Sequence, residues 1–353
     1  MIFQSNTGNL FVRVALAASL FIGGPLAAAA PGWAIPDGVK TVEVGGYPIS
    51  YIEAGSGVAV VMLHGAWVDH RFLAPQVTEF SKTHRAIAPS LRHYYPESWD
   101  GKEGAFSVSQ HAADVAAMIR ELKLGKVHLL GHSRGGAVAV NVARQAPELI
   151  RTLILEDAGG LEPLLADESA GRQRIVGSAR LGAFLRGTLD SSDRVTTART
   201  AWNTANGADA WARMSPAMQQ MITDNIGTMT AKTPYDAPAI GCDDIRKFNF
   251  PVLILHGERS QKIWSDMSAS MRQCKPALAE PVIVPDAAHN MHFNNPTFFN
   301  KAVLEFMEQH SFEHAAIISD MDRNLTKPVV RESMIADFQN NLLNKVYREI
   351  SEE

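Results

Sequence analysis

Apolar residues between positions 39 and 157 follow two alternating patterns. Some form short continuous runs, such as Val58–Leu63, which are typical of strands buried on both faces. Others recur every three or four residues, as in Ser107–Leu124, which is typical of an amphipathic helix. With a predicted hairpin, the strands cover 41–44, 49–52, 58–63, 85–89, 126–130 and 151–155, and the helices cover 107–124 and 134–145. This alternation predicts an α/β fold with a mostly parallel sheet covered by helices on both faces.

The pattern changes beyond residue 158. The next ninety residues contain no clear strand, and their spacing predicts helices over 172–185, 192–203 and 208–226. Strand patterns then resume at 251–255 and 281–284, before a helix near 297–310. We therefore interpret 35–158 and 250–310 as two parts of one core, 159–249 as a helical cap, and 311–353 as a helical C-terminal extension.

The first 34 residues resemble an export signal rather than a part of the fold. They contain one base, Arg13, followed by the apolar stretch Val14–Ile22 and a run of alanines. A basic start, a short apolar stretch and small residues describe a cleavable signal peptide. We predict cleavage after Ala29 or Ala34, a periplasmic or secreted mature protein, and no stable membrane span after processing; an uncleaved anchor or a buried helix is the alternative.

Composition and charge exclude several classes of protein. Apolar residues make up 46% of the 353 residues and charged residues 20%, which is ordinary for a globular protein. Thirty-three basic against 37 acidic residues give a net charge of −4, so no nucleic-acid partner is expected. Cys242 and Cys274 are too few for an all-cysteine zinc site. In an oxidising compartment they can form a bridge worth about 3 kcal/mol, or remain two buried thiols.

The strongest chemical signal is the pentapeptide Gly131–Gly135, which contains Ser133. It follows a predicted buried strand and opens a predicted helix, which is the context of a nucleophile elbow. The sharp reversal from strand to helix leaves little room on either side of the serine, and glycine meets that need. Ser133 would then lie at the carboxyl edge of the sheet, beside a helix N-terminus that favours negative charge. A glycine-rich turn in a binding protein is the alternative interpretation.

A serine hydroxyl needs a base to accept its proton. His289 follows the predicted strand 281–284 and precedes the last core helix, which places it on a loop at the same edge as Ser133. His292 is a possible rival three residues further on, and His132 is adjacent to the serine but should point away. The chain order of serine, acid and histidine favours His289 as the base.

The imidazole in turn needs a carboxylate that fixes its tautomer. Asp157 ends the predicted strand 151–155, and Glu258 follows the strand 251–255. Adjacent strands would bring both to neighbouring points on one edge, so both remain candidates. We prefer Asp157 because it lies at the strand tip, and Glu156 should alternate away from it.

The transition state of acyl transfer needs amide donors for its oxyanion. The amide of Arg134, directly after the nucleophile, is the first candidate. The turn after Val58–Leu63 supplies the second, because Gly65 permits a close approach and Ala66 follows it.

These features together resemble the α/β-hydrolase superfamily, over about residues 40–310. The resemblance rests on His64-Gly65, on Gly131–Gly136 and on Ala288-His289. It implies an eight-stranded, mostly parallel sheet, with the cap inserted between strands six and seven. It also implies a triad of Ser133, His289 and an acid. One departure is notable: relatives often have an acid three residues after the glycine that follows strand seven, where this chain has Ser260. Some relatives instead take the acid from the end of strand six, which fits Asp157.

The function that we predict is exported serine hydrolysis of a carboxylic ester, lactone or thioester of a small, moderately hydrophobic molecule. Neither a metal nor an organic cofactor is required. Cofactor-free perhydrolysis or carbon–carbon bond hydrolysis with the same triad is an alternative, as is a silent binding protein on this scaffold. The natural substrate, the oligomeric state and the role of the C-terminal extension are open at this point.

Overall fold

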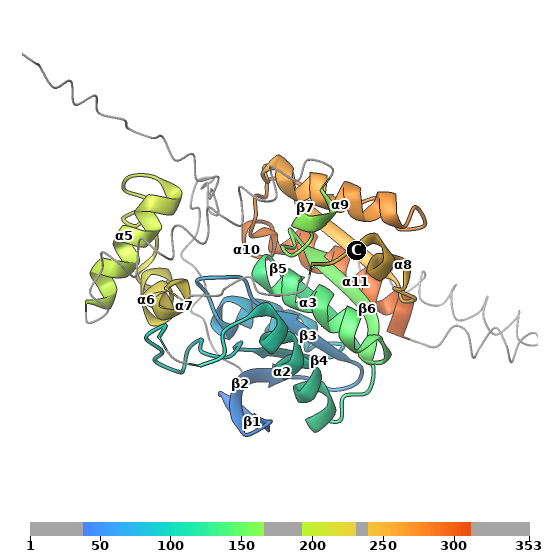
Figure 1. The fold of residues 1–353 in the computed structure, drawn as a ribbon, viewed down its shortest axis with the longest axis horizontal. Coiled ribbons are helices and arrows are strands. Elements are labelled where there is room, and N and C mark those ends of the chain that lie inside the picture. Colours follow the sequence, from blue (N-terminus) through green and yellow to red (C-terminus); the bar gives the residue numbers. More distant parts are fainter. Residues whose placement is uncertain (1–37, 103, 166–192, 231–238, 312–353) are drawn as a thin grey trace, which may run out of the picture. The chain divides into compact units, whose positions relative to one another are not determined.

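The computed structural model describes residues 38–102, 104–165, 193–230 and 239–311. Its centre is an eight-stranded sheet in the order β1-β2-β4-β3-β5-β6-β7-β8 (Figure 1). The strands are β1 Lys40–Val44, β2 Tyr47–Ala54, β3 Ala59–Leu63, β4 Arg85–Pro89, β5 Val127–His132, β6 Ile150–Glu156, β7 Val252–Gly257 and β8 Val282–Val284. Only the pairs β1–β2 and β2–β4 are antiparallel. The prediction of an eight-stranded, mostly parallel sheet with helices is therefore confirmed.

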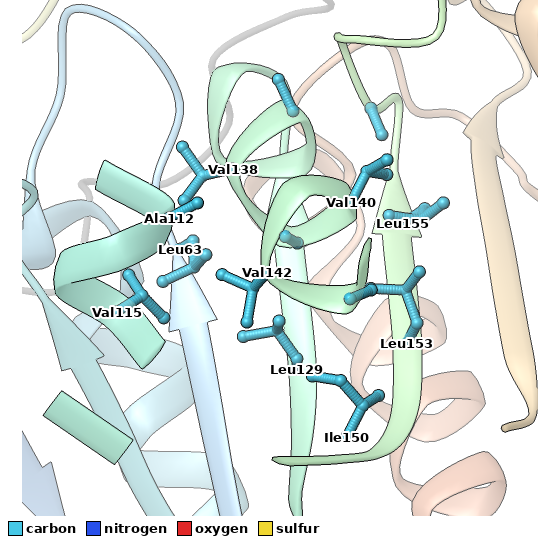
Figure 2. Packing of buried hydrophobic residues seen from close by; sticks show 14 of the residues in the cluster. Leu63, Ala112, Val115, Leu129, Val138, Val140, Val142, Ile150, Leu153 and Leu155 are labelled. Carbon is cyan, nitrogen blue, oxygen red and sulfur yellow. The ribbon is translucent and has the colours of Figure 1, made fainter. Parts of the chain in front are cut away.

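Both faces of the central strands are buried, which explains their continuous apolar runs. Successive residues of β3 point to opposite faces: Val61 and Leu63 join one hydrophobic cluster, and Val60 and Met62 join the other. Figure 2 shows the first cluster, in which strand residues pack against helices α2 and α3. Each fully buried aliphatic side chain contributes about 1.5–3 kcal/mol of burial free energy. This packing makes the central sheet a rigid base for the loops at its edge.

The larger helices around the sheet are α1 Ala74–Phe80, α2 Val108–Glu121, α3 Arg134–Gln145, α9 Lys262–Cys274 and α11 Pro296–Ser311. The shorter ones are η1 His70–Leu73, η2 Pro147–Leu149, η3 Glu162–Leu164, α8 Cys242–Arg246 and α10 Met291–Asn294. The helices α1 and α9 were not predicted from the sequence, although Trp264, Met267 and Met271 of α9 have helical spacing and are buried. Two compact units divide the chain after Met307, and all elements described here except the last turn of α11 belong to the first.

The helices α5 Arg194–Asn206, α6 Pro216–Asp224 and α7 Ile226–Met229 lie between η3 and α8, in the stretch of chain that joins β6 to β7. We call them the inserted helices. The predicted helix 208–226 was wrong in extent, because α6 begins only at Pro216, which has no amide to donate within a helix. The hydroxyl of Ser215 caps α6 by accepting from the Met218 amide. The predicted helix 172–185, the signal peptide and the C-terminal extension lie outside the described residues.

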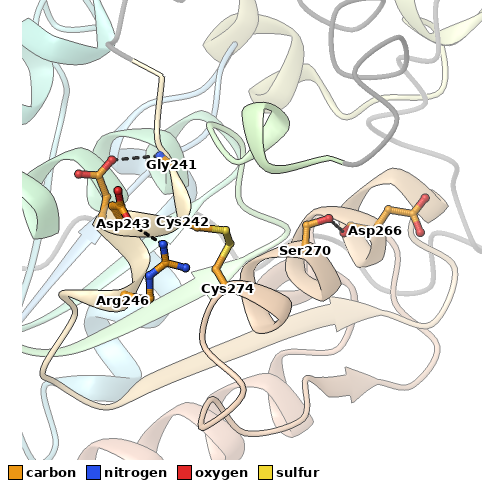
Figure 3. The surroundings of a disulfide bond; sticks show 8 residues. Gly241, Cys242, Asp243, Arg246, Asp266, Ser270 and Cys274 are labelled. Carbon is orange, nitrogen blue, oxygen red and sulfur yellow. Dashed lines mark hydrogen bonds and ion pairs between the residues drawn. A yellow bond between two sulfur atoms is a disulfide. The ribbon is translucent and has the colours of Figure 1, made fainter.

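A disulfide joins Cys242 in α8 to Cys274 at the end of α9, with 4.9 Å between their Cα atoms (Figure 3). The bridge closes 32 residues of sequence and resolves the choice between a bridge and free thiols. Across the described ranges, no helix combines the length and apolar character needed to cross a bilayer.

Candidate active site

Ser133 lies on a strained turn between β5 and α3, as an elbow requires. Its φ is 52° and its ψ is −116°, a conformation that costs a non-glycine residue about 1–3 kcal/mol. Close packing explains the glycine two residues further on: a Cβ on Gly135 would lie 2.2 Å from the carbonyl oxygen of Leu63. The amide of Gly159, just after β6, donates to the Ser133 carbonyl (2.8 Å). The serine is thus held between the ends of β5 and β6, at the N-terminus of α3.

The structure brings Asp157 and His289 together. Asp157 follows β6 directly, has a φ of 36° and is fully buried. Its Oδ2 lies 3.2 Å from Nδ1 of His289. Because an ionised carboxylate only accepts hydrogen bonds, Nδ1 carries a proton, and in a singly protonated ring the lone pair is on Nε2. That Nε2 is buried and has no hydrogen-bond partner among the described residues.

Asp157 accepts two further hydrogen bonds. Nδ1 of His256, at the end of β7, donates to Oδ1 (2.8 Å), and the hydroxyl of Ser260 donates to Oδ2 (2.5 Å). Burial alone would raise the pKa of Asp157, but the hydrogen bonds from His256 and His289 outweigh it and hold that pKa below its ordinary value. The carboxylate is therefore ionised at neutral pH.

Glu258, the rival acid, has another role. It is exposed, and its carboxylate accepts the main-chain amide of Asp286 (2.9 Å), on the loop that leads to His289. The contact with the imidazole thus belongs to Asp157. Ser260 occupies the position at which relatives often have an acid. Its hydroxyl donates a hydrogen bond to Asp157, the acid at the end of β6.

The turn after β3 passes directly against the nucleophile. A Cβ on Gly65 would lie 3.2 Å from Cβ of Ser133, so only glycine fits without displacement. Ala66 follows, and Trp67 is buried with a φ of 72° against Trp202 of the inserted helices, with 5.5 Å between the ring centroids. The Ala66 turn therefore lies beside Ser133, and Arg134, directly after Ser133, is the first residue of α3.

His64 fixes this turn as a neutral imidazole, a role that the sequence analysis did not identify. Nε2 accepts the Leu91 amide (3.0 Å), so the proton is on Nδ1, which donates to the Gly65 carbonyl (2.8 Å). Burial lowers the pKa of His64 to about 4, which keeps the ring uncharged. The His-Gly pair at the end of a buried strand was the available signal.

A second polar cluster, His132, Glu156 and His292, lies next to the first. Nδ1 of His292 lies 2.8 and 2.9 Å from the two oxygens of Glu156, and the His292 amide donates to Oε1 (3.1 Å). His132 donates through Nε2 to the carbonyl oxygen of His289 (3.0 Å). One potential ligand atom from each of these three residues lies within 4.8 Å of the other two. Within the described ranges, this is the group of side chains that could hold a metal ion. Each already makes a hydrogen bond, and these bonds account for the arrangement.

Trp264 of α9 covers the candidate base. Its ring stacks on the His289 imidazole, with 4.4 Å between centroids and 22° between planes. An aromatic face in this position stabilises an imidazolium. The contact was missed because α9 itself was not predicted.

Comparison with known proteins defines the class. A family model described as the alpha/beta hydrolase family matches residues 60–302, more than half of the chain. The chain therefore belongs to the alpha/beta hydrolase family, as the resemblance in its motifs indicated.

Two curated relatives and one solved structure illustrate the similarity. The chain is 26% identical to a 2-(acetamidomethylene)succinate hydrolase of Mesorhizobium japonicum, over 76% of this chain and 95% of the relative. It is 28% identical to a 2-hydroxy-6-oxo-2,4-heptadienoate hydrolase of Pseudomonas putida, over 66% of this chain and 83% of the relative. A thermophilic esterase from Thermogutta terrifontis has a similar fold, with a TM-score of 0.59 and 21% identity, over 78% of this chain and all of that one.

Proposed function

We propose that the protein is an exported serine hydrolase that cleaves a carboxylic ester, or a related lactone or thioester, through an acyl-enzyme. The observation that carries the proposal is the pairing of His289 with the buried Asp157. This pairing places the proton on Nδ1 and leaves Nε2, which has no hydrogen-bond partner among the described residues, as the nitrogen that would serve the strained Ser133. A neutral imidazole in that tautomer is what a serine nucleophile requires.

In the proposed reaction, Oγ of Ser133 attacks the substrate carbonyl carbon, and Nε2 of His289 takes the hydroxyl proton. Asp157 stabilises the imidazolium that forms. The amides of Ala66 and Arg134 bind the oxyanion, a contribution worth about 3–4 kcal/mol per donor in comparable sites. Collapse expels the alcohol, which receives the proton from His289. Water then attacks the acyl group by the same route, which releases the acid and regenerates the serine.

A second candidate is the cleavage of an unsaturated oxo acid or of a related carboxylated substrate. The similarity to a heptadienoate hydrolase and to an acetamidomethylene-succinate hydrolase favours it. The same triad would act, with water or Ser133 attacking a ketone or amide carbonyl and a carbon or nitrogen leaving group. Perhydrolysis would use hydrogen peroxide in place of water on the acyl-enzyme.

Substrate size and export are further parts of the proposal. The inserted helices bury apolar side chains, among them Trp202, which packs on Trp67 beside the Ala66 turn. These side chains favour a small, moderately hydrophobic substrate. The pattern of the first 34 residues favours secretion, and the bridge between Cys242 and Cys274 suits an oxidising compartment. N-terminal sequencing of the protein from a cell-envelope fraction tests the predicted cleavage after Ala29 or Ala34.

The mechanism is tested with an activated phosphonate followed by peptide mass spectrometry. We expect a single adduct on Ser133, none in Ser133→Ala, and turnover of aryl esters of short acyl chains. Turnover of unsaturated oxo acids without any turnover of esters would instead support the second candidate. An adduct on another residue, or none, contradicts the serine mechanism. Ligand binding that survives Ser133→Ala without any turnover would identify a binding protein.

A further inference from the structure

Two imidazoles, not one, contact the candidate acid. His256 Nδ1 donates to Asp157 Oδ1 at 2.8 Å, and His289 Nδ1 donates to Oδ2 at 3.2 Å. Asp157 and His256 are neighbours by strand register, because the Asp157 amide donates to the carbonyl of Leu255 in β7 (3.1 Å). Neither the family match nor the names of the relatives assign a role to His256.

The second nitrogen distinguishes the two imidazoles. Nε2 of His256 lies 2.6 Å from Oγ of Ser268 in α9, so this ring is engaged at both ends. Nε2 of His289 has no hydrogen-bond partner among the described residues. A base must have a nitrogen available to move a proton, and a support must not. The geometry therefore separates a proton carrier, His289, from a ring that only holds the carboxylate.

Ser260 completes the support on the other oxygen. Its hydroxyl donates to Oδ2 at 2.5 Å, the same oxygen that faces His289. Asp157 is strained, with a φ of 36°, and such a conformation persists only where surrounding contacts impose it. The donors on Oδ1 and Oδ2 supply those contacts, and the two imidazoles among them lower the pKa of the buried carboxylate.

We propose that His256 and Ser260 are positioning residues, which hold the Asp157 carboxylate so that Oδ2 faces Nδ1 of His289. This inference rests on the proposed serine mechanism. As positioning residues they would act through the Asp157 carboxylate and not on the substrate, so their loss should lower kcat and leave KM nearly unchanged. A displacement of about 1 Å in such a contact reduces turnover on the order of 100-fold.

The test compares three substitutions of His256 on an aryl ester. His256→Leu removes both hydrogen bonds, and we expect kcat to fall on the order of 100-fold, with KM changed by less than about threefold. His256→Asn places an amide where Nδ1 was, so it should retain kcat within about tenfold of the parent. His256→Gln places its amide toward Ser268 instead, and should behave like His256→Leu.

A matched control is His128→Leu, since His128 is a buried histidine of β5 whose Nδ1 pairs with the Thr152 hydroxyl (2.8 Å). If His256→Leu lowers kcat no more than His128→Leu does, the inference is wrong. A double-mutant cycle supplies the second criterion. In an Asp157→Asn background, His256→Leu should change kcat by less than about threefold, whereas a merely structural effect would add in full.

Nitrogen-15 NMR of the histidine side chains reports the tautomer of His289 directly and does not depend on turnover. It therefore tests the inference even if His256→Leu fails to fold. In the full chain, and in His256→Asn, His289 should be the Nδ1–H tautomer. In His256→Gln and Ser260→Ala it should become a mixture of tautomers, and an unchanged tautomer overturns the inference. Failure of the proposed function would appear differently, as a parent protein that neither turns over esters nor reacts with the phosphonate.

Discussion

Two histidine–carboxylate pairs occur where the carboxyl end of β6 meets the loop and short helix that follow β8, and their chemistry is almost the same. The carboxylates are consecutive residues, Glu156 and Asp157, and the imidazoles, His292 and His289, are three residues apart. All four side chains are buried, and His132 lies between the two imidazoles, at 5.0 and 4.8 Å between ring centroids. Proximity of an acid to an imidazole therefore does not identify a catalytic pair.

The two pairs differ in how the carboxylate is used. Glu156 is the last residue of β6, and both its carboxylate oxygens face His292. They accept hydrogen bonds from the imidazole and the main-chain amide of that residue. Asp157 is strained, and its oxygens are shared among His256, Ser260 and His289. We propose that the first arrangement stabilises a loop and that the second orients the catalytic base. Strain and shared hydrogen bonds, rather than burial, are what separate the pair that we propose to be catalytic from the other pair.

The largest expected effect separates the pairs by activity. Asp157→Asn preserves size but favours the wrong tautomer of His289, so kcat should fall about 10⁴-fold. Glu156→Gln, one residue away, should keep kcat within about tenfold. Steady-state kinetics on one ester compare the two, with Glu258→Gln as the control for the rival acid. A larger loss in Glu156→Gln or in Glu258→Gln than in Asp157→Asn would reverse our assignment.

Acid pH should act on buried neutral histidines before it acts on Asp157. Burial lowers the pKa of His64 to about 4 and that of His132 well below 6.5, so the unfolded chain binds protons that the folded chain does not. Stability is therefore lost as pH falls below about 6.5, by about 3 kcal/mol for His64 as pH 4 is approached. The pKa of Asp157 is depressed instead, so its contribution is lost only below about pH 3.8.

Urea unfolding at pH 7 and pH 5 measures this loss. The parent should be less stable at pH 5, and His64→Gln should lose less between the two pH values. An equal loss in both proteins would show that His64 is not the group that titrates.

The next effect separates the pairs by stability. Glu156→Gln weakens charge-assisted hydrogen bonds to the ring and amide of His292, and should cost about 2 kcal/mol of unfolding free energy. Thermal denaturation monitored by circular dichroism checks it, with Asp157→Asn measured alongside. If Glu156→Gln leaves the melting temperature unchanged, the second pair does not stabilise the loop.

The smallest expected effect concerns the ring beside each imidazole. Trp264 stacks on His289, whereas Phe72 meets His292 edge-on at 4.7 Å and 80°. Trp264→Leu removes an aromatic face that stabilises the imidazolium, at about 1 kcal/mol, or about fivefold in kcat. Phe72→Leu should lower the melting temperature but leave kcat within about twofold. Equal effects of both on kcat would remove this distinction.

Much of the fold was predictable because its signals are local. The continuous runs of β3 and β5 and the helical spacing of α2 and α3 each follow from burial on a regular backbone. The helix α9 was missed because its N-cap position, Gln261, makes no side-chain capping bond and no acid is in its first turn. The start of α6 was misplaced because the helical spacing was read through Pro216.

The sequence by itself determined the elbow around Ser133 and placed His289 on a loop at the carboxyl edge of the sheet. Both follow from short segments in which glycine, strand and helix signals adjoin. Only the tertiary structure distinguished Asp157 from Glu258, joined Cys242 to Cys274, and brought His256 to the acid. Those contacts join residues from 32 to 132 positions apart in the chain. They depend on which strands are neighbours and in which register they pair, and no local pattern of side chains encodes that choice.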